Sequence, residues 1–247
     1  MNRTAAFFAL NRSVTGLLVM VVLVALGEKM AERFLPIYLL ALGGGVLSIG
    51  LLNGLDNLLS ALYSFPGGYL AGRLGARRSL LVFNGMAMAG YLVVILIPHP
   101  FAVIGGAFLF LSWTALSLPA TMQILADAVP RTRRTMGVSV ISITKRIPMS
   151  LGPLLGGALI GIYGETRGVR LAFVVAFLLA AVATVLQQRL IAEERPGTPL
   201  PGRAPAGPGS PFRLLRAMDA ALRRLLVADI LVRFCEQIPY AFVVVWA

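Results

Sequence analysis

Cysteine, histidine and charged side chains are scarce in this sequence. Cys235 and His99 are the only residues of their types, and Asp, Glu, Lys and Arg together make up 13% of the 247 residues. One cysteine cannot form an intramolecular disulfide, and one histidine cannot supply a Ser–His dyad or a histidine-rich metal site. Soluble domains carry about 25% charged residues. The composition therefore excludes a disulfide framework and argues against a water-soluble domain.

Apolar residues are abundant instead, at 58% of the chain with a mean hydropathy of +0.85. Seven apolar stretches are long enough to cross a hydrocarbon core of about 30 Å as helices. They run approximately over residues 14–40, 47–70, 79–97, 101–125, 136–163, 171–190 and 225–246. We therefore expect an all-α polytopic membrane protein in the lipid bilayer, with a six-helix bundle followed by a seventh transmembrane helix.

Arginine is distributed unevenly between the loops that join these stretches. The chain has 22 basic and 10 acidic residues, a net charge of +12. One side has only Arg167 and Arg170, whereas the other has fifteen arginines: Arg3, Arg12, Arg73, Arg77, Arg78, Arg131, Arg133, Arg134, Arg189, Arg195, Arg203, Arg213, Arg216, Arg223 and Arg224. Because basic loops stay in the cytoplasm, we expect a cytoplasmic N-terminus in the plasma membrane, or in the inner membrane of a bacterium. The excess basic charge then reflects topology and not nucleic-acid binding.

A Pro- and Gly-rich segment, residues 195–211, separates the sixth stretch from the seventh and indicates a cytoplasmic linker. Helically spaced leucines follow it, in either an amphipathic helix on the membrane or an extension of the seventh span. We expect three parts. These are a six-helix transmembrane bundle over 1–192, the linker and amphipathic helix over 193–224, and the first transmembrane helix of a truncated second bundle over 225–247.

Three motifs occur in the order found in one transporter family. The segment GGYLAGRLGARRS, residues 67–79, resembles the signature loop between helices two and three of the major facilitator superfamily, at Gly68, Leu70, Ala71, Arg73, Gly75 and Arg77, with Arg78 beside them. Residues 126–137 resemble the loop between helices four and five of the family, and residues 151–159 its glycine-rich fifth helix. Gly72 stands where the family usually has an acidic residue, so the cytoplasmic latch made by that acid is not implied.

The resemblance implies a secondary active transporter of a small solute that works by alternating access between two six-helix bundles. This sequence supplies one bundle and the first helix of the next, so we expect a truncated transporter that does not transport alone. The alternatives are a non-transporting membrane fragment or an intramembrane enzyme. Against an enzyme, Asp56 lacks an obvious second catalytic aspartate in a facing helix. The sequence has no P-loop, so an ATP-driven pump is also unsupported, and no cofactor is expected.

Charged residues inside the spans are the candidate functional residues, because buried charges are costly unless they are paired or face a wet cavity. We predict a solute or coupling cavity formed by Glu28, Lys29, Glu32, Arg33, Asp56, Lys145, Arg146 and Glu236. Coupling to a proton or another ion is one possible use of this cavity, and no metal site is expected. The alternative for the first span is an internal Lys29–Glu32 pair that serves only as a scaffold.

Two finer predictions follow from helical geometry. Arg33 and Asp56 lie about 16 and 18 Å below the first outer turn, at one level, which predicts an ion pair. Arg146 shares a helix face with Ser139, Ser142, Ser150 and Pro153. Lys145 lies nearer Gly152 and Gly156, a face suited to close helix packing. Arg146 is therefore the candidate for contacting an anionic solute, and Lys145 for a buried or proton-linked role. The alternative is that Glu28, Glu32 or Glu236 neutralises both.

Three other residue types receive structural interpretations. We expect His99, between Pro98 and Pro100, to lie in an outer turn. Trp113 is interpreted as a packing residue, and Met86 and Met88 as core fillers and not metal ligands.

Overall fold

The computed structural model describes residues 12–111, 113–128 and 134–190, and seven positions between 221 and 232. The chain divides into two units, Met1–Pro196 and Gly197–Ala247. The described elements of the first unit are all helices: α2 (Arg12–Glu32), α3 (Leu35–Ala41), α4 (Val46–Leu74), α5 (Ala76–Leu96), α6 (Pro100–Phe110), α7 (Trp113–Ala128), α8 (Arg134–Tyr163) and α9 (Glu165–Leu190). The seven described positions of the second unit are also helical. The predicted linker, Glu236 and most of the seventh span lie outside the described residues.

Glycine with positive φ makes two of the sharpest turns. Gly75 separates α4 from α5 with a φ of 82°, and Gly164 separates α8 from α9 with a φ of 79°. A residue with a Cβ is strained in this region of backbone conformation, whereas glycine is not. Successive long helices can therefore reverse direction over a single residue.

The first predicted span is two helices and not one. The chain leaves the helical conformation at Arg33 and Phe34, and α3 begins at Leu35 with Pro36 in its first turn. Proline has no backbone N–H, so Pro36 cannot donate to the carbonyl four residues earlier, at Glu32. The prediction of one continuous helix over 14–40 is therefore wrong at the position of this break.

The fourth predicted span contains α6 and α7, and residue 112 between them lies outside the described residues. Leu111 keeps a helical conformation and its N–H donates to the Ala107 carbonyl, so the helical geometry of α6 continues through Leu111. By length and composition alone, three stretches of the described chain could cross a membrane: Ala76–Leu96, Pro100–Leu125 and Glu165–Leu190.

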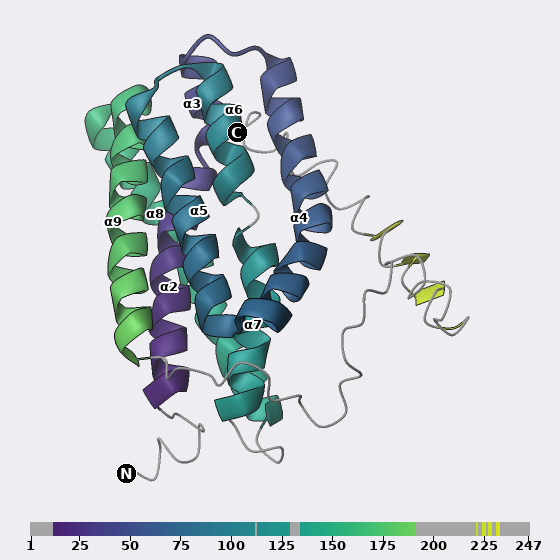
Figure 1. Ribbon diagram of the computed structural model, residues 1–247. Helices are drawn as coiled ribbons and strands as arrows, with labels where there is room; N and C mark the ends of the chain where they lie inside the picture. The colour runs from purple at the N-terminus through teal and green to yellow at the C-terminus, as the bar shows by residue number, and fades with distance from the viewer. Residues whose placement is uncertain are drawn as a thin grey trace. The chain divides into compact units, whose positions relative to one another are not determined.

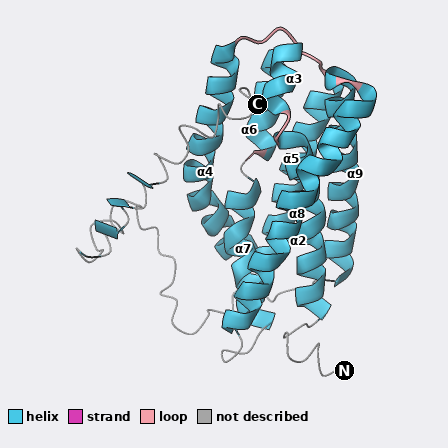
Figure 2. Ribbon diagram, turned by 180° about the vertical axis from the view of Figure 1, so that it is seen from behind, coloured by secondary structure: helices cyan, strands magenta, loops and turns pink. Residues whose placement is uncertain are grey.

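The helices of the first unit run along a common direction and form one bundle (Figure 1). Helix α2 packs against α7, α8 and α9, while α5 packs against α6, α7 and α9. Helix α4 packs mainly on α7 and lies on the opposite side of the bundle from α8, as the reverse view also shows (Figure 2). The rings of Tyr91, Phe110 and Phe173 fill the space between α5, α6 and α9, with centroids 5.1 to 5.9 Å apart.

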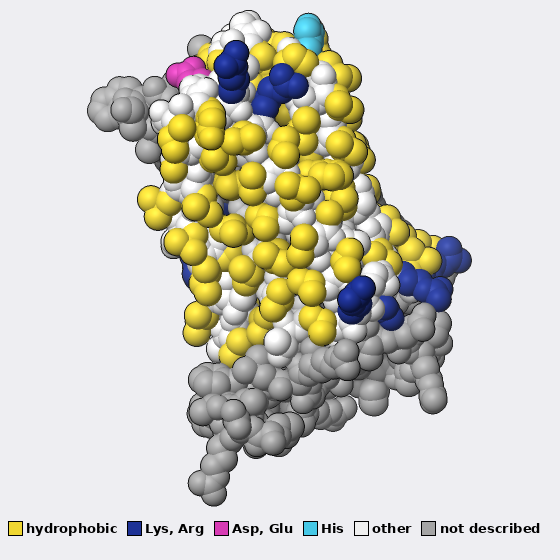
Figure 3. Space-filling view, turned by 90° about the vertical axis from the view of Figure 1, so that its left-hand side faces the viewer, with side chains coloured by type: hydrophobic (Ala, Val, Ile, Leu, Met, Phe, Trp, Pro, Cys, Tyr) yellow, Lys and Arg dark blue, Asp and Glu magenta, His cyan; other side chains and the backbone are white. Residues whose placement is uncertain are grey.

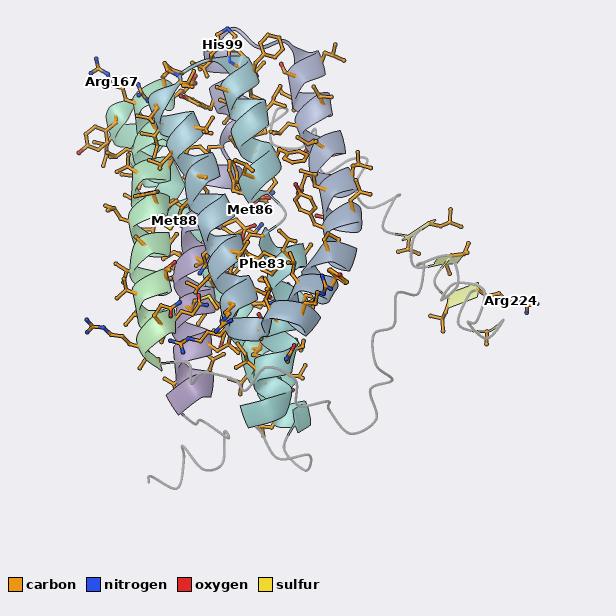
Figure 4. All side chains as sticks on the ribbon, in the orientation of Figure 1. Phe83, Met86, Met88, His99, Arg167 and Arg224 are labelled. Carbon is orange, nitrogen blue, oxygen red and sulfur yellow. The ribbon has the colours of Figure 1, made fainter. Side chains whose placement is uncertain are left out.

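Apolar side chains cover the middle of the face shown in Figure 3, and Lys and Arg side chains gather toward its two ends. This is the distribution expected of a bundle whose outer surface faces lipid. Figure 4 labels His99 and Arg167 at the same end of the bundle. His99 is exposed in the turn before α6, as predicted, and its Nδ1 accepts a hydrogen bond from the Phe101 amide at 3.4 Å.

Candidate functional site: a charged cluster between α2, α4, α7 and α8

The centre of the candidate site is a group of charged residues in the last turns of α2. Lys29 Nζ lies 2.5 Å from Glu32 Oε2, and the side chains of Lys29 and Glu32 are 25% and 21% exposed. They are three residues apart, so they face each other on adjacent turns of one helix. An internal Lys29–Glu32 pair was the alternative to a ligand-binding role that the sequence left open. The pair is present in the structure.

Glu28 is buried more deeply than its neighbours, with 1% of its surface exposed. Its carboxylate accepts a hydrogen bond from Thr114 Oγ1 at 3.3 Å, which connects α2 to the first turn of α7. The charges of Lys29, Glu32 and Asp56 also act on Glu28. A buried carboxylate is therefore held beside the first turn of α7.

Asp56 on α4 completes the cluster from the other side of the bundle. The charges that act on it are those of Glu32 and Lys29. Among the ion pairs of the described residues there is none between Arg33 and Asp56, so that prediction is wrong. The depth count assumed an unbroken helix through Arg33, but α2 ends one residue earlier, at Glu32, which changes both the depth and the direction of the Arg33 side chain.

The two basic residues of α8 lie in different surroundings. Lys145 is half-buried and interacts electrostatically with Glu28. Arg146 is exposed, as are Ser139, Ser142 and Ser150. In the described part of the chain, the guanidinium of Arg146 forms no ion pair with an acid. The four polar residues are thus exposed on α8, together with the apolar Ile143, Ile147 and Met149.

Close helix packing holds α8 against the charged part of α2. A methyl carbon placed on Gly152 would lie 2.8 Å from Lys29 Cβ, and one on Gly156 would overlap the Met30 carbonyl oxygen and lie 2.6 Å from Phe34 Cε2. Small residues permit this approach between membrane helices. The prediction that Gly152 and Gly156 form a packing face is confirmed.

Residues of the signature loop occupy the opposite end of the bundle from His99. The Arg77 guanidinium donates to the backbone carbonyl of Gln188 on α9 and, at 3.0 Å, to its Oε1. Arg73 lies over the Tyr69 ring, 5.4 Å from its centroid. Gly68 is half-buried and Arg78 is exposed.

The sequence interpretation missed a buried polar chain that joins three helices. Trp113 Nε1 donates to Asn84 Oδ1 at 2.8 Å, and Asn84 Nδ2 donates to Gln187 Oε1 at 3.0 Å. Gln187 Nε2 then donates to the Arg77 carbonyl at 2.9 Å. Trp113 is therefore a hydrogen-bonding residue as well as a packing residue. The sequence feature that could have indicated this buried chain is Asn84, a polar residue inside an uncharged apolar span.

Two methionines of α5 belong to the core of the bundle. Met86 and Met88 pack against the hydrophobic core, as predicted. Within the described residues, no group of three or more His, Cys, Asp and Glu side chains could hold a metal ion.

Comparison with known proteins assigns the chain to a family. The family model of the Major Facilitator Superfamily matches residues 17–246. The chain belongs to this superfamily. It is 30% identical over 124 residues to an uncharacterised MFS-type transporter, YfkF, of Bacillus subtilis (strain 168), a match that covers 49% of this chain and 31% of the relative. This superfamily chain is therefore a multi-pass membrane protein of a transporter family.

Solved structures of transporters share the fold. Crystal structures of a peptide transporter, POT, as an E310Q mutant in complex with alafosfalin or with sulfate, superpose with a TM-score of 0.63 at 21% and 22% identity. The matches cover 90% and 92% of this superfamily chain and 46% of the solved chains. The chain therefore spans about half the length of these structures, and the likeness concerns the fold.

Proposed function

We propose that this superfamily chain takes part in moving a small solute across the plasma membrane by alternating access. Membership of the family supports a transporter. The 15 to 2 distribution of loop arginines supports a cytoplasmic location for the N-terminus and the signature loop. The charged cluster and the four polar residues of α8 would then line the path of the solute or of a coupling ion.

The solute carries an anionic group, such as a carboxylate or a phosphate. The observation that carries this proposal is the exposed Arg146, which has no acidic partner in the described chain and lies on a face with three exposed serines. Lys29, in contrast, is already paired with Glu32 at 2.5 Å. A guanidinium in a narrow cavity gains most from a bidentate anion, because two parallel hydrogen bonds form with one planar group.

The acidic residues support a second role for the same cavity. Glu28, Glu32 and Asp56 all act on the one ammonium of Lys29, and Lys145 contributes a further positive charge near Glu28. Carboxylates that outnumber their nearest cations can accept a proton or a cation. We assign coupling to this cluster and solute contact to Arg146.

Replacing Arg146 with Gln tests the assignment. The 247-residue chain in lipid nanodiscs is titrated with sulfate, inorganic phosphate and succinate, with glucose as the uncharged probe, and binding is followed by the rise in unfolding temperature. Arg146→Gln should weaken anion binding by roughly 10- to 100-fold, because it removes charge-assisted hydrogen bonds of about 1.5–3 kcal/mol.

Arg167→Gln is the matched control, because Arg167 is equally exposed but lies at the end of the bundle near His99. It should bind anions like the parent chain. Arg146→Lys should bind with intermediate affinity, since lysine keeps the charge and loses the planar fork. Undiminished anion binding by a folded Arg146→Gln variant contradicts the proposal, and a loss of folded protein favours a structural role.

A further inference from the structure

The first turn of α7 is joined to two other helices through consecutive residues. Trp113 is the first residue of α7, and Thr114 follows it. Consecutive residues of a helix point about 100° apart. Trp113 is directed to Asn84 on α5 while Thr114 donates to Glu28 on α2, so the two residues link α7 to two different helices.

The chain of hydrogen bonds from Trp113 can run in only one direction. An indole N–H donates and cannot accept, so Asn84 must present its oxygen to Trp113 and its amide nitrogen to Gln187. Gln187 must then accept with its oxygen and donate to the Arg77 carbonyl, which can only accept. A donor-only group and an acceptor-only group fix the two ends, so neither amide can flip without losing bonds.

Burial makes this arrangement costly to disturb. Trp113 is 2% exposed, and Asn84 and Gln187 are 0% exposed. Water cannot replace a lost partner at these positions, so a rotation of α7 that moved Trp113 away would leave several buried polar groups unpaired. The chain of bonds also ends at the signature loop, where the Arg77 side chain binds Gln188.

We propose that Asn84, Trp113 and Gln187 are positioning residues for the Glu28 site: by fixing the rotation of the first turn of α7, they hold the Thr114 hydroxyl on the Glu28 carboxylate. The inference rests on the proposed function only because Glu28 belongs to the proposed cavity. Its test measures helix geometry and needs no solute, so it can fail or succeed independently of anion binding.

A double-mutant cycle between helices tests the proposal on the 247-residue chain in nanodiscs. Thr114→Val removes the hydroxyl that reaches Glu28, and Asn84→Leu removes the amide that holds Trp113. Asn84 and Thr114 share no hydrogen bond, so independent effects on the unfolding temperature should add. We expect instead that Thr114→Val loses at least half of its effect in the Asn84→Leu background, because the hydroxyl has already left Glu28.

Thr121→Val is the matched control. Thr121 lies two turns further along α7, and its hydroxyl donates only to its own helix, at the Ser117 carbonyl. Its effect should be the same in the parent chain and in the Asn84→Leu background. Asn84→Asp keeps an oxygen acceptor for the indole, so Thr114→Val should retain its effect in that background.

A second measurement follows the rotation of α7 directly. Leu118 is exposed one turn beyond Thr114, so Leu118→Cys in a Cys235→Ser background can be labelled with the membrane-permeant N-ethylmaleimide. Asn84→Leu should change the labelling rate about fivefold, the equivalent of one net hydrogen bond, and Asn84→Asp should leave it near the parent rate. Additive losses in the cycle, or equal labelling in all three chains, overturn the proposal. If Asn84→Leu does not fold, Trp113→Phe removes the same hydrogen bond and takes its place in both measurements.

Discussion

Replacing Gly156 with alanine should force α8 away from α2 at the level of the charged cluster. The new methyl carbon would overlap the Met30 carbonyl oxygen and lie 2.6 Å from Phe34 Cε2. Ordinary carbon–carbon contact begins near 3.5 Å, so the helices must separate by roughly 1 Å or the Phe34 ring must move. The Met30 carbonyl is part of the α2 backbone and cannot move by itself.

The expected loss of unfolding free energy is about 1–3 kcal/mol, the usual cost of overpacking a close contact. Part of that loss is masked, because alanine favours a helix over glycine by up to about 1 kcal/mol. Gly161→Ala measures this gain alone, since Gly161 lies on the same helix and a methyl carbon added there would have nothing within 4 Å.

Both variants are made in the 247-residue chain, and unfolding is followed in nanodiscs or mild detergent. Gly161→Ala should unfold at or slightly above the parent temperature, and Gly156→Ala several degrees below it. Equal unfolding temperatures for the two variants would refute the inference that glycine at 156 is required by the contact with α2.

Two other expectations concern charge. Lys29→Met should lower the unfolding free energy by roughly 1–3 kcal/mol, because it leaves Glu28, Glu32 and Asp56 without their shared cation, and adding Glu32→Gln should restore part of the loss. A double variant as unstable as the sum of the single variants would show that the pair contributes nothing. For topology, reporter fusions at Gly202 and after Ala247 should report the cytoplasm and the outside respectively, and one compartment for both would contradict a seventh span.

Hydropathy and small-residue patterns were sufficient to predict much of the bundle. Apolar stretches of about 20 residues have few structural solutions in lipid, so the all-helical fold follows from composition. The Gly152 and Gly156 face was predictable because residues four apart share one side of a helix, and only glycine lets another backbone approach so closely. The exposure of Arg146 follows from the same periodicity.

The sequence could not predict which charges meet. The Arg33–Asp56 pair was inferred by counting residues from a turn, and the count failed where α2 ended at Glu32. A break of two residues changes both the depth and the rotation of the residues on its far side. Counting residues across the break therefore does not identify contact partners. Pro36 could have suggested this break.

The buried chain from Trp113 to Arg77 was invisible for a different reason. Its members come from three helices and are separated by up to 110 residues for a single hydrogen bond, Gln187 to Arg77. Periodicity within one helix identifies a face but not the polar group on the facing helix. An isolated Asn in an apolar span therefore predicts that a partner exists, without identifying it.

The composition of that chain has a consequence for proton leakage. An indole, two carboxamides and a peptide carbonyl do not gain or lose protons between about pH 5 and pH 9. A row of such groups cannot relay a proton by handing it from one member to the next, unlike a row of water molecules, carboxylates or histidines. The hydrogen-bonded chain from Trp113 to Arg77 therefore provides no proton path of its own between the first turn of α7 and the signature loop.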